Sequence, residues 1–331
     1  MDSVTQIVLG AAVGEAVLGR KVGNKAMLYG AIGGTIPDLD IICNYFVDTV
    51  TALEWHRGVT HSILFSIVAA PLFGWLISRW EKIATAKDWS WLFFFCFLTH
   101  PLLDAHTTWG TQLFWPFDLR LAYKNIFVID PLYTLPFLVF LLLAMRRNRT
   151  DLKRRRLNNL GLWVSSSYLL LTIALKGFTY VKFKNSLDEQ GIFYTEIETK
   201  PAPLTTILWT ANVDVGDAFL IADYSLFDSK PIEFYDHPKN HHWLGDLKEN
   251  EKIKRLIKLT NGWYTITQKD GNLYFNDLRF GVLSANPASK EYVFSFLLDG
   301  TREKLTITEN QKRPEDAATL LSDLWVRIKG N

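Results

Sequence analysis

The chain has 331 residues, 48% of them hydrophobic, and its 36 basic and 34 acidic residues give a formal net charge of +2. This near balance argues neither for nor against a nucleic-acid partner, and the length suffices for two domains of ordinary size. The two cysteines, Cys43 and Cys96, lie in apolar sequence without CxxC spacing, so neither a disulfide framework nor a thiolate metal site is supported.

Apolar segments crowd the first 180 residues: Val4–Leu18, Met27–Pro37, Ile63–Ser78, Trp89–Leu103, Val128–Met145 and Leu160–Leu175. Each is shorter than the roughly 20 residues that span a bilayer comfortably, so each one alone also fits a buried core helix. Two of them, Ile63–Ser78 and Leu160–Leu175, contain no charge and therefore no face that water solvates. We predict that residues 1–180 form an all-α polytopic membrane domain of about six helices. The N-terminus lacks the basic start of a secretory signal, and we expect it to be retained.

Basic residues gather in three alternate loops of this region: Arg20, Lys21 and Lys25; Arg79, Lys82 and Lys87; and Arg146, Arg147, Arg149, Lys153, Arg154, Arg155 and Arg156. Short basic loops stay in the cytoplasm. With six crossings, both termini and the loops Asp38–His56 and Asp104–Val128 are then expected on the outer side of a bacterial inner membrane.

Residues 181–331 resemble ordinary soluble sequence, and we predict an extracytoplasmic α+β domain. Strands are expected at Phe193–Thr199, Thr205–Val213, Ala218–Tyr224, Gly262–Thr267, Leu273–Phe275, Val293–Leu298 and Lys304–Thr308, and helices at Leu247–Leu259 and Pro314–Ile328. Asp270-Gly271-Asn272 predicts a hairpin turn, and Asp299-Gly300 a second turn. The aromatic residues Trp209, Tyr224, Phe234, Tyr235 and Trp243 suit an interface belt or a ligand rim, unless they are core. We expect this domain to act as a lid or a substrate-recognition module that contributes no metal ligand.

Ionisable residues at the ends of the apolar segments are the candidate site, because charge at the edge of hydrocarbon is costly unless it is paired, hydrated or bound to a metal. His100 and Asp104 are four residues apart on a predicted helix and so share one face. They suit a metal, or else an isolated hydrogen bond between helices. Asp38 and Asp40 would point to the same side in extended backbone, although one of them could cap a helix.

His56 and His61 flank Gly58, and a turn there would let both rings point into one pocket. Each histidine alone fits equally well a side chain that snorkels at the headgroup level. Arg57 suits an oxyanion, or a pairing with Asp38 or Asp40. Glu15 and Asp130 are expected to orient ligands or to act as bases, whereas His237, His241 and His242 look like surface residues. His106 continues the outer loop with Thr107, Thr108 and Gln112 and is expected to line the site.

Four motifs in order resemble the YdjM-like family of membrane-bound metal-dependent hydrolases: Met1–Gln6 with Gly10–Glu15, Pro37–Asp40, His56–Ser62 and Thr99–Asp104. The resemblance covers roughly residues 1 to 145 and implies a bacterial inner-membrane protein with Asp40, His56, His100 and Asp104 in the metal site. More distantly, the pattern is similar to zinc-dependent phospholipases C and single-strand nucleases. It lacks their N-terminal tryptophan ligand and their later histidine pair, which argues against a full three-zinc cluster.

We therefore predict a metal-dependent hydrolase that acts on a phosphoester or lipid-like substrate at the outer face of the inner membrane. A divalent metal, zinc in the first instance, would be held by His56, His100 and Asp104, and Asp40 would orient or deprotonate its water. His61 would be a second-metal ligand or the proton donor, Arg57 the oxyanion clamp, and Asp38 a further ligand. The alternative is a non-enzymatic membrane protein whose polar cluster fixes helix packing and whose outer domain binds a partner.

Overall fold

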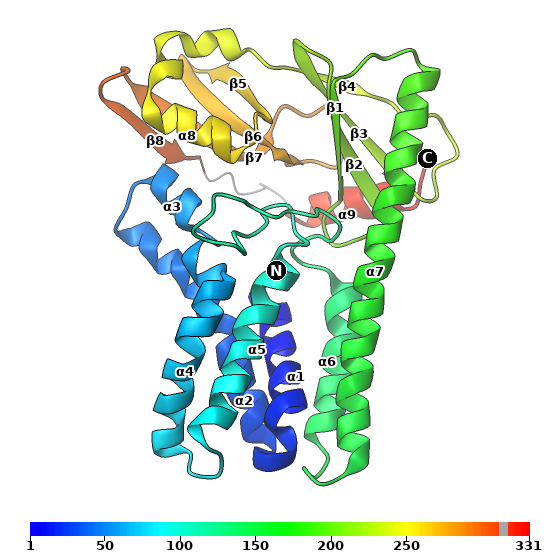
Figure 1. Ribbon diagram of the computed structural model, residues 1–331. Helices are drawn as coiled ribbons and strands as arrows, with labels where there is room; N and C mark the ends of the chain where they lie inside the picture. Colours follow the sequence, from blue (N-terminus) through cyan, green and yellow to red (C-terminus); the bar gives the residue numbers. More distant parts are fainter. Residues whose placement is uncertain (311–316) are drawn as a thin grey trace. The chain divides into compact units, whose positions relative to one another are not determined.

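The computed structural model describes residues 1–310 and 317–331, which form two compact units. The first, called here the helical unit, consists of Met1–Cys43, Trp55–Ala174 and Pro203–Thr205. The second, called the sheet unit, consists of Asn44–Glu54, Leu175–Ala202 and the described part of Thr206–Asn331. The chain thus has a helical N-terminal region, followed by two antiparallel sheets with helices (Figure 1).

Each of the six apolar segments lies wholly or mostly in a helix of the structure, although Met27–Pro37 continues into a 3₁₀ helix and residues 128–130 precede their helix. The helices are α1 (Ser3–Val22), α2 (Asn24–Thr35), α4 (Ile63–Trp80), α5 (Ala86–Asp104), α6 (Pro131–Met145) and α7 (Leu152–Glu189), and the short η1 (Ile36–Tyr45) and η2 (Val59–His61) join them. Three stretches within the described residues are long and apolar enough to cross a membrane: Asn24–Tyr45, Ile63–Trp80 and Leu152–Glu189. Local sequence sets the helix starts. Ser62 accepts a hydrogen bond from the backbone N–H of Phe65, and Thr85 forms a capping box with Asp88.

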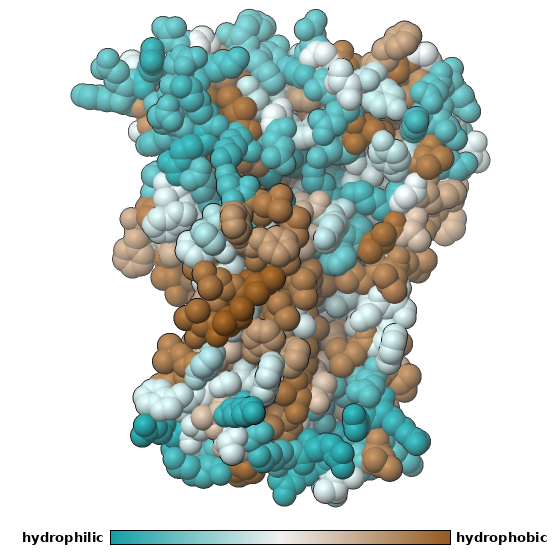
Figure 2. Space-filling view, in the orientation of Figure 1, coloured by the Kyte–Doolittle hydropathy of each residue, from teal (hydrophilic) through white to brown (hydrophobic). Residues whose placement is uncertain are grey.

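Large apolar side chains also cover the outside of these helices. Figure 2 shows a hydrophobic band over their middle and hydrophilic residues at the end below it. Exposed members of the band include Leu64, Ile67, Val68, Leu72 and Trp75 on α4, Leu132, Leu135 and Val139 on α6, and Trp163, Leu170 and Leu171 on α7. An exposed apolar surface of this extent is unfavourable in water, and it suits contact with lipid.

The sheet unit contains two four-stranded antiparallel sheets, each with its strands in chain order. The first sheet consists of β1 (Glu196–Pro201), β2 (Leu208–Asp214), β3 (Ala218–Ser225) and β4 (Tyr235–Pro238). The second consists of β5 (Tyr264–Lys269), β6 (Asn272–Val282), β7 (Tyr292–Gly300) and β8 (Leu305–Glu309). Asp270 and Gly271 both have positive φ between the paired residues Lys269 and Asn272, so the predicted hairpin turn is present.

The structure differs from the sequence expectations for this unit at two points. Strand β4 and the helix α3 (Thr49–Trp55) were not foreseen, and Val50 of α3 joins the buried cluster around Ile253 and Phe275. The predicted Leu247–Leu259 helix divides into η3 (His241–Glu249) and α8 (Glu251–Leu259), because Asn250 caps α8 with its side chain. The last helix is α9 (Ala317–Ile328), and its expected start at Pro314 lies outside the described residues.

His237 is not the surface residue that its sequence context suggested. Its ring is fully buried, with Nε2 facing the carbonyl oxygen of Pro287 and Nδ1 facing the hydroxyl of Tyr292 on the other sheet. The carbonyl only accepts, so Nε2 donates and Nδ1 accepts from Tyr292. Trp209 is likewise fully buried and belongs to the core, whereas Trp243 is exposed.

Burial lowers the pKa of His237 to about 4, and this makes the stability of the sheet unit depend on pH. The unfolded chain binds this proton below about pH 6.5, whereas the folded chain resists it until about pH 4. We therefore expect the free energy of unfolding to fall by up to roughly 3 kcal/mol as the pH drops through that interval. Denaturant unfolding of the full chain should show this fall, and His237→Gln should flatten it. An equal slope in wild type and variant would contradict the assignment.

Candidate metal centre

Four ionisable side chains meet where helices of the helical unit end. Asp38 lies on η1, His61 ends η2, and His100 and Asp104 share one face of the last turns of α5. One ligand atom from each lies within 4.8 Å of all the others. The Nε2 atoms of His61 and His100 are 3.1 Å apart, and Oδ1 of Asp38 lies 3.4 Å and 3.3 Å from them. Oδ2 of Asp104 lies 3.3 Å from Nε2 of His61 and 3.5 Å from Nε2 of His100.

The partners of the other ring nitrogens indicate which nitrogen of each histidine carries a proton. Nδ1 of His100 lies 2.6 Å from the carbonyl oxygen of Gly34, which can only accept a hydrogen bond. Nδ1 of His61 lies 3.1 Å from the Thr60 hydroxyl and 3.5 Å from Oδ2 of Asp40, and the carboxylate favours a proton there. In the neutral rings both Nε2 atoms are then unprotonated. Two imidazole lone pairs and two carboxylate oxygens thus converge, and a cation is the species that satisfies them.

Three of the four side chains are fully buried, which strengthens the case for a bound cation. The side chains of His61, His100 and Asp104 have no exposed surface, whereas that of Asp38 is 23% exposed. Oδ1 of Asp104 accepts from Nε2 of Gln6 at 2.9 Å and also contacts the nitrogen of Met1. Oδ2 of Asp104 is buried and has no hydrogen bond among the described residues, although it lies 3.1 Å from Nε of Arg57, so it keeps a lone pair for a cation. These residues fit a divalent cation, with Asp38 on the accessible side.

Asp40 and His56 form a separate pair beside the four ligands. Oδ1 of Asp40 lies 3.2 Å from Nδ1 of His56, and its Oδ2 accepts the backbone N–H of Arg57 at 2.7 Å. The His56 side chain is 32% exposed. Asp38 and Asp40 do not point to the same side, contrary to the expectation from extended backbone, because η1 is a 3₁₀ helix in which two residues turn by about 240°. They instead approach opposite ring nitrogens of His61.

Arg57 pairs with neither Asp38 nor Asp40 through its side chain. Its Nε lies 3.1 Å from Oδ2 of Asp104, and its Nη1 donates to the Thr107 hydroxyl at 2.8 Å. The residue is buried and has a φ of 57°, a left-handed conformation that is unusual for a residue with a side chain. The Asp40 bond to its backbone N–H helps to hold this conformation, which places a permanent positive charge beside the four ligands.

Several other candidates lie away from the four ligands. Glu15 pairs with Arg154, and Asp130 caps α6 and accepts a hydrogen bond from the hydroxyl of Tyr168. His106 faces Asn125 through its Nδ1. Sequence reasoning missed two contributors, Gln6 and the carbonyl of Gly34. Gln6 belongs to the Met1–Gln6 motif of the family resemblance, but that motif assigned it no role, and nothing in a sequence marks one carbonyl among many.

Comparisons with known proteins find one family and one relative, both described as inner membrane proteins. The sequence model of the YdjM inner membrane protein family matches residues 1–180, more than half of the chain. Inner membrane protein YbcI of Escherichia coli (strain K12) is 33% identical over 99 residues, which are 30% of this chain and 57% of YbcI. The chain therefore spans little more than half the length of that relative. No solved structure matches.

Proposed function

The chain belongs to the YdjM inner membrane protein family, and from this premise we propose that it is a multi-pass, metal-dependent hydrolase of the bacterial inner membrane. We further propose that the substrate is a phosphoester or other lipid-like molecule and that residues 181–331 lie outside the cytoplasm. The observation that carries the proposal is the convergence of four metal-ligating groups, three of them buried, at the helix ends.

The arrangement of charge along the bundle supports the topology. Lys21 pairs with Asp88, Lys25 pairs with Glu81, and Arg149 donates to the carbonyl of Lys21, so the three basic loops meet at one end of the helices. Gln6, which reaches Asp104, is 14 residues before Arg20 on α1, a rise of about 21 Å. The metal site and the basic loops thus lie at opposite ends, which is what a cytoplasmic basic end and an outer active site require.

The residues present would support hydrolysis in distinct ways. His61, His100, Asp104 and Asp38 would hold zinc or a similar cation, which when bound acidifies a water molecule and so supplies a nucleophile near neutral pH. The carboxylates of Asp38 and Asp104 offset the charge of a divalent cation, and Arg57 adds a permanent positive charge that would attract an anionic phosphoester.

His56 is the residue we assign to proton transfer. Its ring is half-buried and lies beside the ligand cluster, and Asp40 contacts its Nδ1, so Nε2 is the nitrogen left to exchange a proton. The sequence alone suggested His61 for this role, but its Nε2 faces the other ligands. In this proposal His61 binds the cation and His56 protonates the leaving group.

Hydrolysis by the purified full chain in detergent tests the proposal, with phosphodiesters, phosphomonoesters and carboxylic esters as probes. We expect cleavage of a phosphoester that a chelator abolishes and added zinc restores. His56→Gln should lower kcat by about 10²- to 10⁴-fold while bound metal is retained, because it removes only the proton donor. His106→Gln is the matched control and should retain full turnover. Metal-loaded protein that cleaves none of these probes would instead favour a structural role for the cluster.

A further inference from the structure

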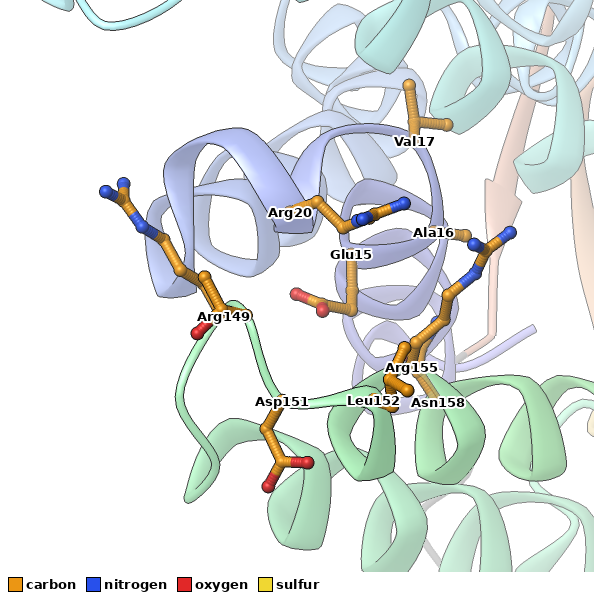
Figure 3. Close-up of a pocket in the computed structure, with 10 residues that line it drawn as sticks. Glu15, Ala16, Val17, Arg20, Arg149, Asp151, Leu152, Arg155 and Asn158 are labelled. Atoms are coloured by element: carbon orange, nitrogen blue, oxygen red, sulfur yellow. The ribbon is translucent and has the colours of Figure 1, made fainter.

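A pocket of about 230 Å³ opens at the basic end of the helical unit, far from the metal centre. It lies between the C-terminal half of α1 and the start of α7, as Figure 3 shows. Arginines from three places line it: Arg20 on α1, Arg149 in the loop before α7, and Arg155 on α7. Neither the metal site nor the proposed hydrolysis uses this pocket.

The carboxylates near the pocket leave its positive charge largely uncompensated. Glu15 lines the pocket but is bound in bidentate fashion by Arg154, at 2.6 Å and 2.5 Å, and both side chains are buried. Asp151 accepts the backbone N–H of Lys153 at the start of α7. The lining thus has three guanidinium groups against one carboxylate that lacks a cationic partner among the described residues.

The arginines themselves are available to a ligand. Arg149 donates to the carbonyl of Lys21, which leaves the rest of its guanidinium free to bind. Arg20 and Arg155 are exposed and have no hydrogen bond or ion pair within the part of the chain that is described. In Figure 3 the side chains of Arg20 and Arg155 extend from α1 and α7 toward the same side of the pocket, whereas Arg149 points to the other side. Two guanidinium groups on one side suit the binding of an anion.

The pocket wall also contains one buried amide side chain. Asn158 lines the same pocket and is 2% exposed; its Nδ2 donates to the carbonyl of Ala12, and its Oδ1 has no donor among the described residues. Asn158 is therefore part of the pocket wall, and the arginines are the groups that would bind a ligand. Apolar Ala16, Val17 and Leu152 also line the pocket, as expected where a headgroup meets its acyl chains.

We propose that this pocket binds a phosphate group, and that the phosphate is the headgroup diester of an anionic phospholipid in the leaflet on the basic side. Basic pockets between transmembrane helices are a recurring way to hold such headgroups. The volume suits a headgroup and is below the range of pockets that enclose a whole drug-sized ligand. The metal centre plays no part in this binding.

Lipid retention by the full chain in nanodiscs tests the proposal, with phosphatidylglycerol, phosphatidylcholine and inorganic phosphate as separate probes. We expect saturable binding of phosphatidylglycerol and none of phosphatidylcholine. The double variant Arg20→Gln, Arg155→Gln should weaken this binding at least tenfold. The control double variant Arg146→Gln, Arg156→Gln removes the same charge from exposed arginines outside the pocket and should stay within twofold of wild type.

Zinc binding at the opposite end reports that both variants are folded. Phosphatidylglycerol binding that depends on Arg20 and Arg155 supports the proposal. Competition by millimolar inorganic phosphate as effective as that by phosphatidylglycerol would support the phosphate site but overturn the lipid as its source. Equal weakening by the two double variants, or no phosphatidylglycerol binding by wild type, would overturn the site itself.

Discussion

His100→Ala and His61→Ala should each abolish stoichiometric binding of zinc to the purified full chain, whereas His56→Ala should retain it. Each of the first two removes one of four converging ligand groups, both from rings without exposed surface. Loss of an outer partner of a metal ligand already costs 10- to 100-fold in affinity, so loss of a ligand itself should exceed about 100-fold. Elemental analysis of detergent-purified protein and competition with a chromogenic chelator would measure both effects.

The contrast between His56 and His61 decides which set of residues holds the metal. The family resemblance implies His56 as a ligand, but the structure places its Nδ1 against Asp40 and brings the Nε2 of His61 to the cluster instead. Thermal unfolding with excess chelator should show whether a variant has lost the fold or only the metal. Loss of zinc from His56→Ala with full retention in His61→Ala would refute the assignment made here.

The sequence predicted the helical half of the molecule well because its signals are local. Uninterrupted apolar runs and the spacing of His100 four residues before Asp104 both act within a few turns of one helix. The shared face of His100 and Asp104 follows from helix periodicity alone. The basic residues of the three short loops likewise predicted that these loops share one end of the helices.

The details of the site depend on conformations that the local sequence does not specify. The opposite directions of Asp38 and Asp40 follow from a 3₁₀ segment, where the sequence was compatible with extended backbone. Arg57 adopts a left-handed conformation, and only the fold shows that its guanidinium reaches Asp104. Strand β4 has four residues and α3 has seven, and Val50 of α3 belongs to the same buried cluster as the distant residues Ile253 and Phe275. Such short elements are stabilised by tertiary contacts more than by their own sequence.

Close packing of α1 on α2 is the second feature whose loss should have a large effect. The two helices meet through glycines, Gly10 and Gly14 on α1 and Gly30 and Gly34 on α2. A Cβ atom added at Gly30 would lie 2.2 Å from the backbone oxygen of Gly10, and one added at Gly10 would lie 2.3 Å from the oxygen of Gly30. Backbone atoms cannot rotate away as a flexible side chain can, so the helices would have to separate.

We expect Gly30→Ala to destabilise the full chain by about 3 kcal/mol, at the upper end of the usual cost of overpacking, because two backbones must move rather than one side chain. The same separation would shift Gly34, whose carbonyl accepts from Nδ1 of His100, so zinc affinity should fall along with stability. Chemical denaturation and zinc titration of the same preparation would measure both quantities.

Gly177→Ala is the matched control, since it adds the same methyl group within helix α7 at a position where the new Cβ atom meets no other atom within 4 Å. There the substitution should be neutral or stabilise the chain by roughly 0.5–1 kcal/mol, because alanine lowers the conformational entropy of the unfolded chain. Zinc affinity should not change. If Gly30→Ala matched this control in both stability and zinc affinity, the α1–α2 contact would not be what positions Gly34 against His100. Because the predicted loss of zinc affinity operates through the carbonyl of Gly34, Gly30→Ala should weaken zinc binding even under conditions in which the variant is fully folded.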